Sequence, residues 1–162
     1  MRREVICRDA LVWLQEQVVL AGHIVTSLPG MTEMNQGEKM VGMTTYRAWF
    51  QDAVAMVLSR LAPRAIAIFY QTDACHDGVW LDKAYLIQRV AENAGCHLLY
   101  HKIVLFSDES VEPTCGHGCP SRYTHLLAFS KIACADEPWF VSCEYYHGVA
   151  AKQHFSNHPA RR

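Results

Sequence analysis

A short apolar segment that runs directly into a proline turn constrains this sequence more than any other feature. Residues 23–26 (His-Ile-Val-Thr) have the composition of a short buried strand, and Ser27, Leu28, Pro29 and Gly30 follow at once. Proline has no N–H and a fixed φ, so the strand must end and the chain must turn sharply. In an open α/β sheet, ligands bind beyond the carboxyl ends of the strands. The pattern therefore predicts either a functional loop at residues 27–30 or a plain structural turn.

Composition limits the class of protein. The chain has 162 residues, a hydrophobic fraction of 51% and a net charge of −1, which predict one soluble α/β domain over residues 1–162 and no polybasic nucleic-acid tail. No apolar run is long enough to span a bilayer, and the first residues do not form a secretory signal. Seven irregularly spaced cysteines without an export signal indicate reduced thiols and a cytoplasmic protein.

Apolar periodicity predicts alternating strands and helices. The clearest stripe, at helical spacing, covers residues 44–62 and ends before Pro63. The order of elements predicts a doubly wound, mostly parallel sheet, whose last strand pairs antiparallel with residues 96–105 as a hairpin-like edge. The expected strands are 4–7, 23–26, 65–70, 96–105 and 123–130. The expected helices are 10–17, capped by Asp9, then 44–62, 81–94, which Gly95 ends, and a tail at 145–157. Residues 73–78 are an expected turn, and residues 27–43 are a candidate lid.

Three separated segments resemble one enzyme family in their order. They are residues 7–11 (Cys-Arg-Asp-Ala-Leu), residues 23–30, and residues 123–131 (Tyr-Thr-His-Leu-Leu-Ala-Phe-Ser-Lys). Together they resemble the circularly permuted S-adenosylmethionine-dependent amino-methyltransferases, in which the catalytic half precedes the cofactor-binding half. Residues 68–73 followed by 80–83 are similar to a group of methylase-like proteins with this layout. The resemblance covers nearly the whole chain and implies a Rossmann-like fold of the class I methyltransferase type.

The resemblance also implies an activity and a set of site residues. It predicts methyl transfer from S-adenosylmethionine to an exocyclic amine of a nucleobase, with nucleic acid as the partner. The side-chain oxygen of Ser27 and the backbone carbonyl beside Leu28 would accept the amine hydrogens, and Pro29 would fix the carbonyl's direction. The catalytic residues are then Ser27, Leu28 and Pro29, and the cofactor-binding residues are Asp9, Ala10 and Thr26.

Part of the family pattern is missing. The cofactor motif Asp-Pro-Phe-x-Gly-x-Gly-Thr should start where this sequence ends, at Arg162, so the resemblance predicts a truncated sheet. Glycine-rich turns let a backbone approach a cofactor closely, so we expect weak or absent binding of S-adenosylmethionine. Without the strand that bears the motif, residues 23–26 would have an open edge. We expect residues 4–7 to pair there, or two chains to form a homodimer.

Two alternatives from other classes remain open. The chain could be a non-catalytic methyltransferase-like module that binds a partner or nucleic acid. It could also be a zinc-stabilised binding domain, although the Cys-x-His-x-Cys spacing is tighter than the usual zinc knuckle and lacks a fixed fourth ligand, so no metal is predicted. The residues concerned are Cys115, His117 and Cys119, with Cys134, Cys143 or His147 as the fourth ligand.

Overall fold

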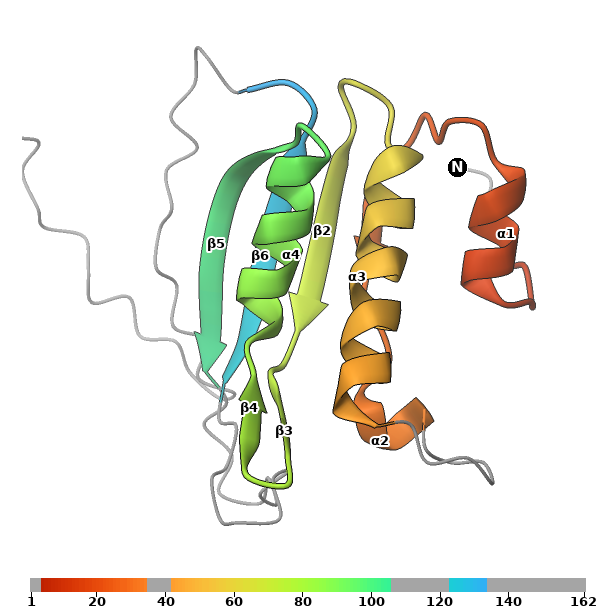
Figure 1. Ribbon diagram of the computed structural model, residues 1–162. Helices are drawn as coiled ribbons and strands as arrows, with labels where there is room; N and C mark the ends of the chain where they lie inside the picture. Colours follow the sequence, from red (N-terminus) through yellow and green to blue (C-terminus); the bar gives the residue numbers. More distant parts are fainter. Residues whose placement is uncertain (1–3, 35–41, 106–122, 134–162) are drawn as a thin grey trace, which may run out of the picture.

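The computed structural model describes residues 4–34, 42–105 and 123–133, which form one layer of helices on a four-stranded sheet (Figure 1). A separate two-stranded hairpin lies beyond the carboxyl end of β2. The helices are α1 (Ala10–Glu16), α2 (Met31–Met34), α3 (Met43–Ser59) and α4 (Lys83–Asn93), and the strands are β1 (Ile24–Thr26), β2 (Ile66–Gln71), β3 (Ala74–His76), β4 (Val79–Leu81), β5 (His97–Leu105) and β6 (Tyr123–Ser130).

The sheet has the strand order β1-β2-β6-β5. β1 and β2 are parallel, whereas β6 is antiparallel to both of its neighbours, β2 and β5. The predicted antiparallel pairing of β5 with β6 is confirmed. The predicted edge position of β6 is wrong, because β6 inserts between β2 and β5 and makes β5 the edge. For the same reason the pairing in the sheet is mostly antiparallel and not mostly parallel.

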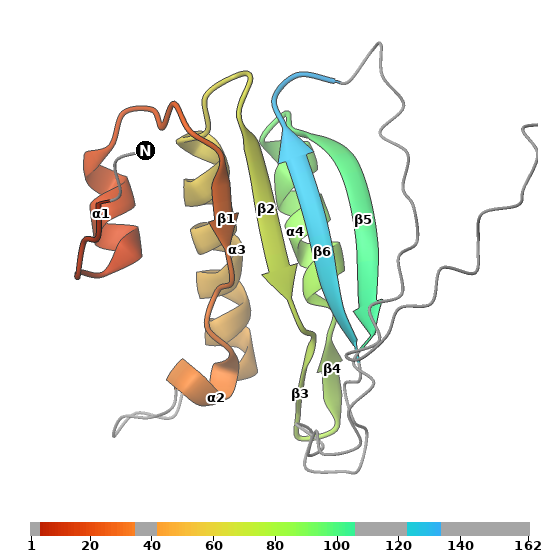
Figure 2. The ribbon, with the colours of Figure 1, turned by 180° about the vertical axis from the view of Figure 1, so that it is seen from behind.

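The two long helices, α3 and α4, cover the same face of the sheet (Figures 1 and 2). The connections β1-α3-β2 and β2-α4-β5 both cross the sheet in the same direction, and right-handed crossovers in one direction place their helices on one side. Within the described ranges no helix covers the opposite face, where Val25 is 72% exposed. The mixed α/β class is therefore confirmed. A doubly wound sheet requires helices on both faces, whereas the described long helices lie on one face only.

α3 forms the centre of the core. The helical stripe predicted for residues 44–62 is confirmed, since most of its apolar side chains are buried in the core, whereas Trp49 is only partly buried. The helix itself ends at Ser59. Lys131, which follows β6, donates to the carbonyls of Ser59 (3.2 Å) and Leu61 (2.6 Å) at the carboxyl end of α3. A lysine at that position satisfies orphan carbonyls and interacts favourably with the helix dipole. The Phe-Ser-Lys end of the β6 segment thus ties the sheet to α3.

The amino-terminal segment differs from the expectation. Residues 4–7 form no strand, and Val5 and Ile6 are 76% and 51% exposed. α1 packs against α3, where Arg60 Nε donates to the Leu14 carbonyl at 3.1 Å, and this packing places α1 beyond β1 (Figure 2). The preceding residues are thereby kept off the open edge of β1. Pairing of two chains through that edge remains a prediction.

The predicted turn around residues 73–78 is a β-hairpin, β3–β4. Asp77 and Gly78 both have positive φ (51° and 75°), as a two-residue type I′ turn requires. Asp-Gly is the usual sequence for this turn, so the signal was available in the sequence. At the end of α4, Gly95 has φ of 66°, which confirms the glycine predicted to end that helix.

Candidate functional site

The loop predicted to be catalytic lies at the carboxyl edge of the sheet. Thr26 is the last residue of β1, and Ser27 to Gly30 connect it to α2. Because β1 and β2 are parallel, both strands end at this same edge. The side chain of Ser27 is exposed and that of Leu28 is 8% exposed. The structure thus brings the three predicted catalytic residues to an edge of the kind where α/β proteins bind ligands.

Gln71, the last residue of β2, holds the backbone of Leu28. In the amide orientation that satisfies both groups, Gln71 donates to the Leu28 carbonyl at 3.3 Å and accepts from the Leu28 N–H. Gln71 is only 2% exposed, so the pair is shielded from water. A carbonyl oxygen has two lone pairs, and one remains for a ligand. Gln71 therefore fixes the direction of the carbonyl that the sequence predicts as an acceptor.

Two further side chains hold the loop from the helix side. The hydroxyl of Tyr46, on α3, donates to the Pro29 carbonyl at 3.0 Å. Burial, with a smaller contribution from Glu33, raises the pKa of Tyr46, so its hydroxyl stays protonated and remains a donor. Glu33, on α2, accepts from the Gly30 N–H at 2.5 Å. Three consecutive backbone positions are thus fixed by side chains from three different elements.

A buried polar cluster lies directly beyond β2. Asp73 Oδ2 accepts from the Tyr123 hydroxyl at 3.1 Å and lies 3.1 Å from His125 Nε2, and Asp73 Oδ1 accepts from the Lys83 N–H at 2.9 Å. The Asp73 and His125 side chains are 4% and 10% exposed. Burial alone would raise the pKa of Asp73, but the hydrogen bonds and the attraction of His125 together lower it below its usual value. His125 Nδ1 in turn lies 2.9 Å from His101 Nε2 on β5.

This cluster joins elements that are far apart in the sequence. It connects the end of β2, the start of α4, and strands β5 and β6 at the same edge as the loop. Asp73 and His125 lie in segments that carry the family resemblance, but the sequence predicted no role for either residue. An acidic residue directly after a buried strand was the available signal; its partner, 52 residues later, could not be inferred from spacing.

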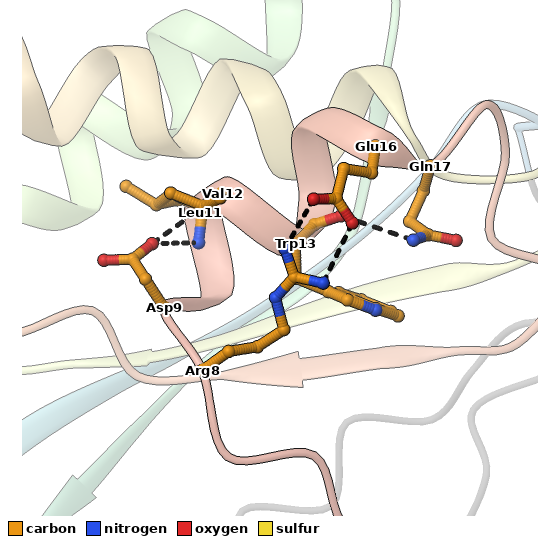
Figure 3. A network of polar contacts seen from close by, with 7 residues as sticks. All are labelled: Arg8, Asp9, Leu11, Val12, Trp13, Glu16 and Gln17. Atoms are coloured by element: carbon orange, nitrogen blue, oxygen red, sulfur yellow. Dashed lines mark hydrogen bonds and ion pairs between the residues drawn. The ribbon is translucent and has the colours of Figure 1, made fainter.

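The residues predicted to bind the cofactor lie on two elements, α1 and β1. Asp9 caps α1, where its Oδ1 accepts from the N–H groups of Leu11 (2.8 Å) and Val12 (2.9 Å), as Figure 3 shows. Ala10 is exposed in the first turn of α1, and Thr26 lies at the end of β1. In the part of the chain that the structure describes, no hydrogen bond joins Asp9 or Ala10 to Thr26.

Arg8, the residue before the cap, is paired with the far end of the same helix. Its guanidinium contacts both carboxylate oxygens of Glu16, at 2.9 Å and 2.5 Å (Figure 3). This exposed ion pair spans α1 and lowers the pKa of Glu16.

The described residues contain no glycine-rich turn of the kind that lets a backbone approach a cofactor closely. The described glycines, Gly22, Gly30, Gly42, Gly78 and Gly95, are far apart in the sequence. The two with positive φ, Gly78 and Gly95, belong to a hairpin turn and a helix end. Weak binding of S-adenosylmethionine therefore stays a prediction.

A binding measurement tests this prediction. We expect the purified chain to bind S-adenosylmethionine more weakly than micromolar, because Asp9 is present but the glycine-rich turn is not. Isothermal titration calorimetry is the measurement. A dissociation constant of about 1 μM, which corresponds to about −8 kcal/mol, would contradict the expectation.

Other predicted features lie outside the described residues. These are residues 35–41 of the candidate lid 27–43, the tail helix at 145–157, and all the candidate zinc ligands: Cys115, His117, Cys119, Cys134, Cys143 and His147. Within the described residues, no group of three or more His, Cys, Asp or Glu side chains is arranged to hold a metal ion. A search of the helices in the same ranges finds none with the length and apolar character needed to cross a membrane.

Comparison with solved structures places the fold among the DNA methyltransferases. The cytosine-N4-specific PvuII DNA methyltransferase aligns with a TM-score of 0.56 at 17% identity, over 77% of this chain and 48% of that chain. A protein from Thermus thermophilus described as a DNA modification methylase aligns with a TM-score of 0.55 as its selenomethionine derivative, at 19% identity over 80% of this chain and 53% of that chain. Its complex with S-adenosyl-L-methionine aligns with a TM-score of 0.55 at 16% identity, over 80% and 56%.

These similarities show a methyltransferase-like fold. The chain spans about half the length of the structures it matches. No family model matches the sequence, and no curated protein matches it either. The predicted resemblance to methylases is thus confirmed at the level of the fold, and the activity is a separate question.

Proposed function

We propose that this protein belongs to the catalytic side of an S-adenosylmethionine-dependent amino-methyltransferase, with loop 27–30 as the site that receives a nucleobase amine. The observation that supports the proposal most is the way this loop is held. Gln71, Tyr46 and Glu33 fix three backbone positions in a row, while the Ser27 hydroxyl next to them is exposed. The PvuII enzyme, which has a similar fold, is specific for an exocyclic amine of cytosine.

Methyl transfer to an amine depends mainly on positioning. The amine lone pair must point at the methyl carbon, and a fixed near-attack geometry can contribute several kcal/mol. In this proposal the Ser27 Oγ accepts one amine hydrogen and the free lone pair of the Leu28 carbonyl accepts the other. Pro29 and Gln71 keep that carbonyl in one direction. A base in a duplex would have to be flipped out of the helix to reach the loop.

In this proposal a complementing cofactor-binding half supplies the glycine-rich turn that holds most of the methyl donor. S-adenosylmethionine supplies an electrophilic methyl group when bound, and Asp9, Ala10 and Thr26 stay proposed contacts at its edge. The permuted order, with the catalytic half first, is part of the same proposal. A non-catalytic methyltransferase-like module is the second candidate, and the lack of a glycine-rich turn among the described residues supports it.

A labelled-methyl assay separates the two candidates. The chain is incubated, alone and with a complementing cofactor-binding domain, with S-adenosylmethionine carrying a tritiated methyl group and with single- and double-stranded DNA. We expect label in the DNA when that domain is supplied and little or none with the chain alone, and more label on single strands because no base pair has to open. DNA binding without incorporated label would favour the non-catalytic module.

Gln71→Ala tests how the loop is held. The substitution releases the Leu28 backbone, so we expect turnover to fall about tenfold or more while the affinity for DNA changes little, because a small misplacement of a positioned group is costly in rate. The measurement is the labelled-methyl assay at saturating DNA. Gln88→Ala is the matched control, since Gln88 lies on α4 and, among the described residues, its side chain hydrogen-bonds only to Glu92, at 3.5 Å. Equal turnover in the two variants would contradict a role for Gln71.

A further inference from the structure

Three polar side chains form a hydrogen-bonded chain that runs from the interior to the surface. Asp73 Oδ2, directly beyond β2, lies 3.1 Å from His125 Nε2 on β6, and His125 Nδ1 lies 2.9 Å from His101 Nε2 on β5. The Asp73 and His125 side chains are 4% and 10% exposed, whereas His101 is an exposed residue. Protons from the solvent therefore reach this chain through His101.

The Asp73 carboxylate decides where the ring hydrogens lie. Burial alone would raise the pKa of Asp73, but its hydrogen bonds and the attraction of His125 lower it, so the group is ionised at neutral pH and can only accept. His125 Nε2 must then carry a hydrogen. In a neutral imidazole the other nitrogen is an acceptor, so His125 Nδ1 accepts from the Nε2–H of His101. In the neutral chain, His101 Nδ1 is the ring nitrogen that can take up a proton without the loss of a hydrogen bond.

One added proton fits into this chain. It binds His101 Nδ1, and the hydrogen between the two rings can then move from His101 Nε2 to His125 Nδ1. All the hydrogen bonds are kept in either position, and with this hydrogen on His125 the positive charge lies beside the Asp73 carboxylate. The two histidines therefore share one added proton, which the buried carboxylate balances.

A second added proton does not fit. Both rings then carry a hydrogen on each nitrogen, so the Nε2–H of His101 and the Nδ1–H of His125 face each other across 2.9 Å. Burial, followed by the charge of His125, lowers the pKa of His101, and the carboxylates of Asp82 and Asp73 oppose that shift only in part. Because two donors and two positive charges repel each other at this distance, the contact between the rings must break.

The other titratable groups around the pair do not remove this conflict. Tyr123 donates its hydroxyl to Asp73 and stays protonated, because burial and then the charge of Asp73 raise its pKa. At the start of α4, Asp82 is the N-cap of the helix, and the ammonium of Lys83 adds a positive charge near Asp73. Among the described residues, Asp73 is the carboxylate that contacts the pair directly, and one carboxylate balances one proton.

We propose that His101 and His125 form a pH-sensitive switch, which holds β5 to Asp73 while the pair carries at most one added proton and opens when a second proton binds. The switch acts on β5, the edge strand of the described sheet. It also borders the support of loop 27–30, because His125 is the register partner of Gln71, and directly opposite residues on neighbouring strands have their side chains on the same face.

The first test is the protonation of each ring, followed by NMR of the purified chain with ¹⁵N-labelled histidine from pH 8 to pH 4. At pH 8 we expect both rings to carry their hydrogen on Nε2. The first added proton should change the signals of His101 and His125 together, and the second should follow in a separate step about one pH unit or more lower. A hydrogen on Nδ1 of His125 at pH 8, or the uptake of both protons in a single step, would overturn the inference.

The second test is amide hydrogen exchange in β5, expressed as protection factors so that the pH dependence of the exchange reaction itself is removed. Neither test uses DNA or S-adenosylmethionine, so both are independent of the proposed function. We expect the protection of the amides near His101 to stay unchanged in the first step and to fall about tenfold or more in the second.

Two variants complete the exchange experiment. His101→Gln offers His125 a donor and an acceptor but does not titrate, so its β5 should keep its protection at low pH. His97→Gln, at an exposed position of the same strand, is the matched control and should behave like the wild type. A wild-type β5 that keeps its protection through both steps would overturn the inference, as would a His101→Gln chain that loses protection as the wild type does.

Discussion

Asp73→Ala is expected to lower the free energy of unfolding by about 3 kcal/mol, a large share of the stability of a domain of this size. The substitution removes the common acceptor of three groups, the Lys83 N–H, the Tyr123 hydroxyl and His125 Nε2. The first and last of these are buried, so water cannot replace the carboxylate without opening the site. Urea denaturation followed by circular dichroism measures the change.

The control and the pH dependence make this prediction specific. Asp52→Ala, at an exposed position of α3, should stay within about 0.5 kcal/mol of the wild type. Because the pKa of Asp73 is lowered in the folded state, its contribution is present above the usual carboxyl pKa of about 4 and is lost as the pH falls through the lower folded value. The difference between wild type and Asp73→Ala should therefore shrink from pH 7 to pH 3. A difference in the free energy of unfolding that stays constant from pH 7 to pH 3 would contradict an ionised Asp73 carboxylate as the common acceptor.

Ser27→Ala is expected to reduce kcat by about 10- to 100-fold while leaving the fold intact, because the hydroxyl acts on the attacking amine. Ser27 is exposed in a turn, so the cost in folding free energy should stay within about 0.5 kcal/mol. Turnover in the labelled-methyl assay and the urea midpoint are measured on the same preparations.

A second exposed serine provides the control for that experiment. Ser59 is the last residue of α3, at the end of the helix away from Tyr46 and loop 27–30. Its hydroxyl donates to the Met56 carbonyl at 2.7 Å. Ser59→Ala should retain wild-type turnover. If Ser27→Ala also retained it, loop 27–30 would be an ordinary turn and the case for an enzyme would depend on fold similarity alone.

Local patterns predicted the elements well and their arrangement poorly. The apolar stripe of α3 and the bounds of β6 follow from periodicity within one segment, and both are confirmed. The place of β6 between β2 and β5 depends on pairing with a strand more than 50 residues earlier, which spacing does not determine. Residues 4–7 have the composition of a strand, but α1 packs against α3 and keeps them from the sheet.

The site was predictable only in part, for a similar reason. Pro29 and the strand before it located the loop, since both signals are contiguous in the sequence. The side chains that fix the loop, Gln71 and Tyr46, come from β2 and α3 and meet it only in the folded chain. The burial of Lys83 and its contact with the Tyr46 ring also depend on the packing of α4 against α3, so the sequence did not predict them.

The most direct test of the central claim is the position of the transferred methyl group. DNA treated with the protein and labelled S-adenosylmethionine is digested to nucleosides, and each labelled nucleoside is identified by mass spectrometry and chromatography against standards. The account predicts the label on an exocyclic nitrogen, because loop 27–30 is arranged to accept the hydrogens of an amine. Label on a ring carbon such as C5 of cytosine would contradict it.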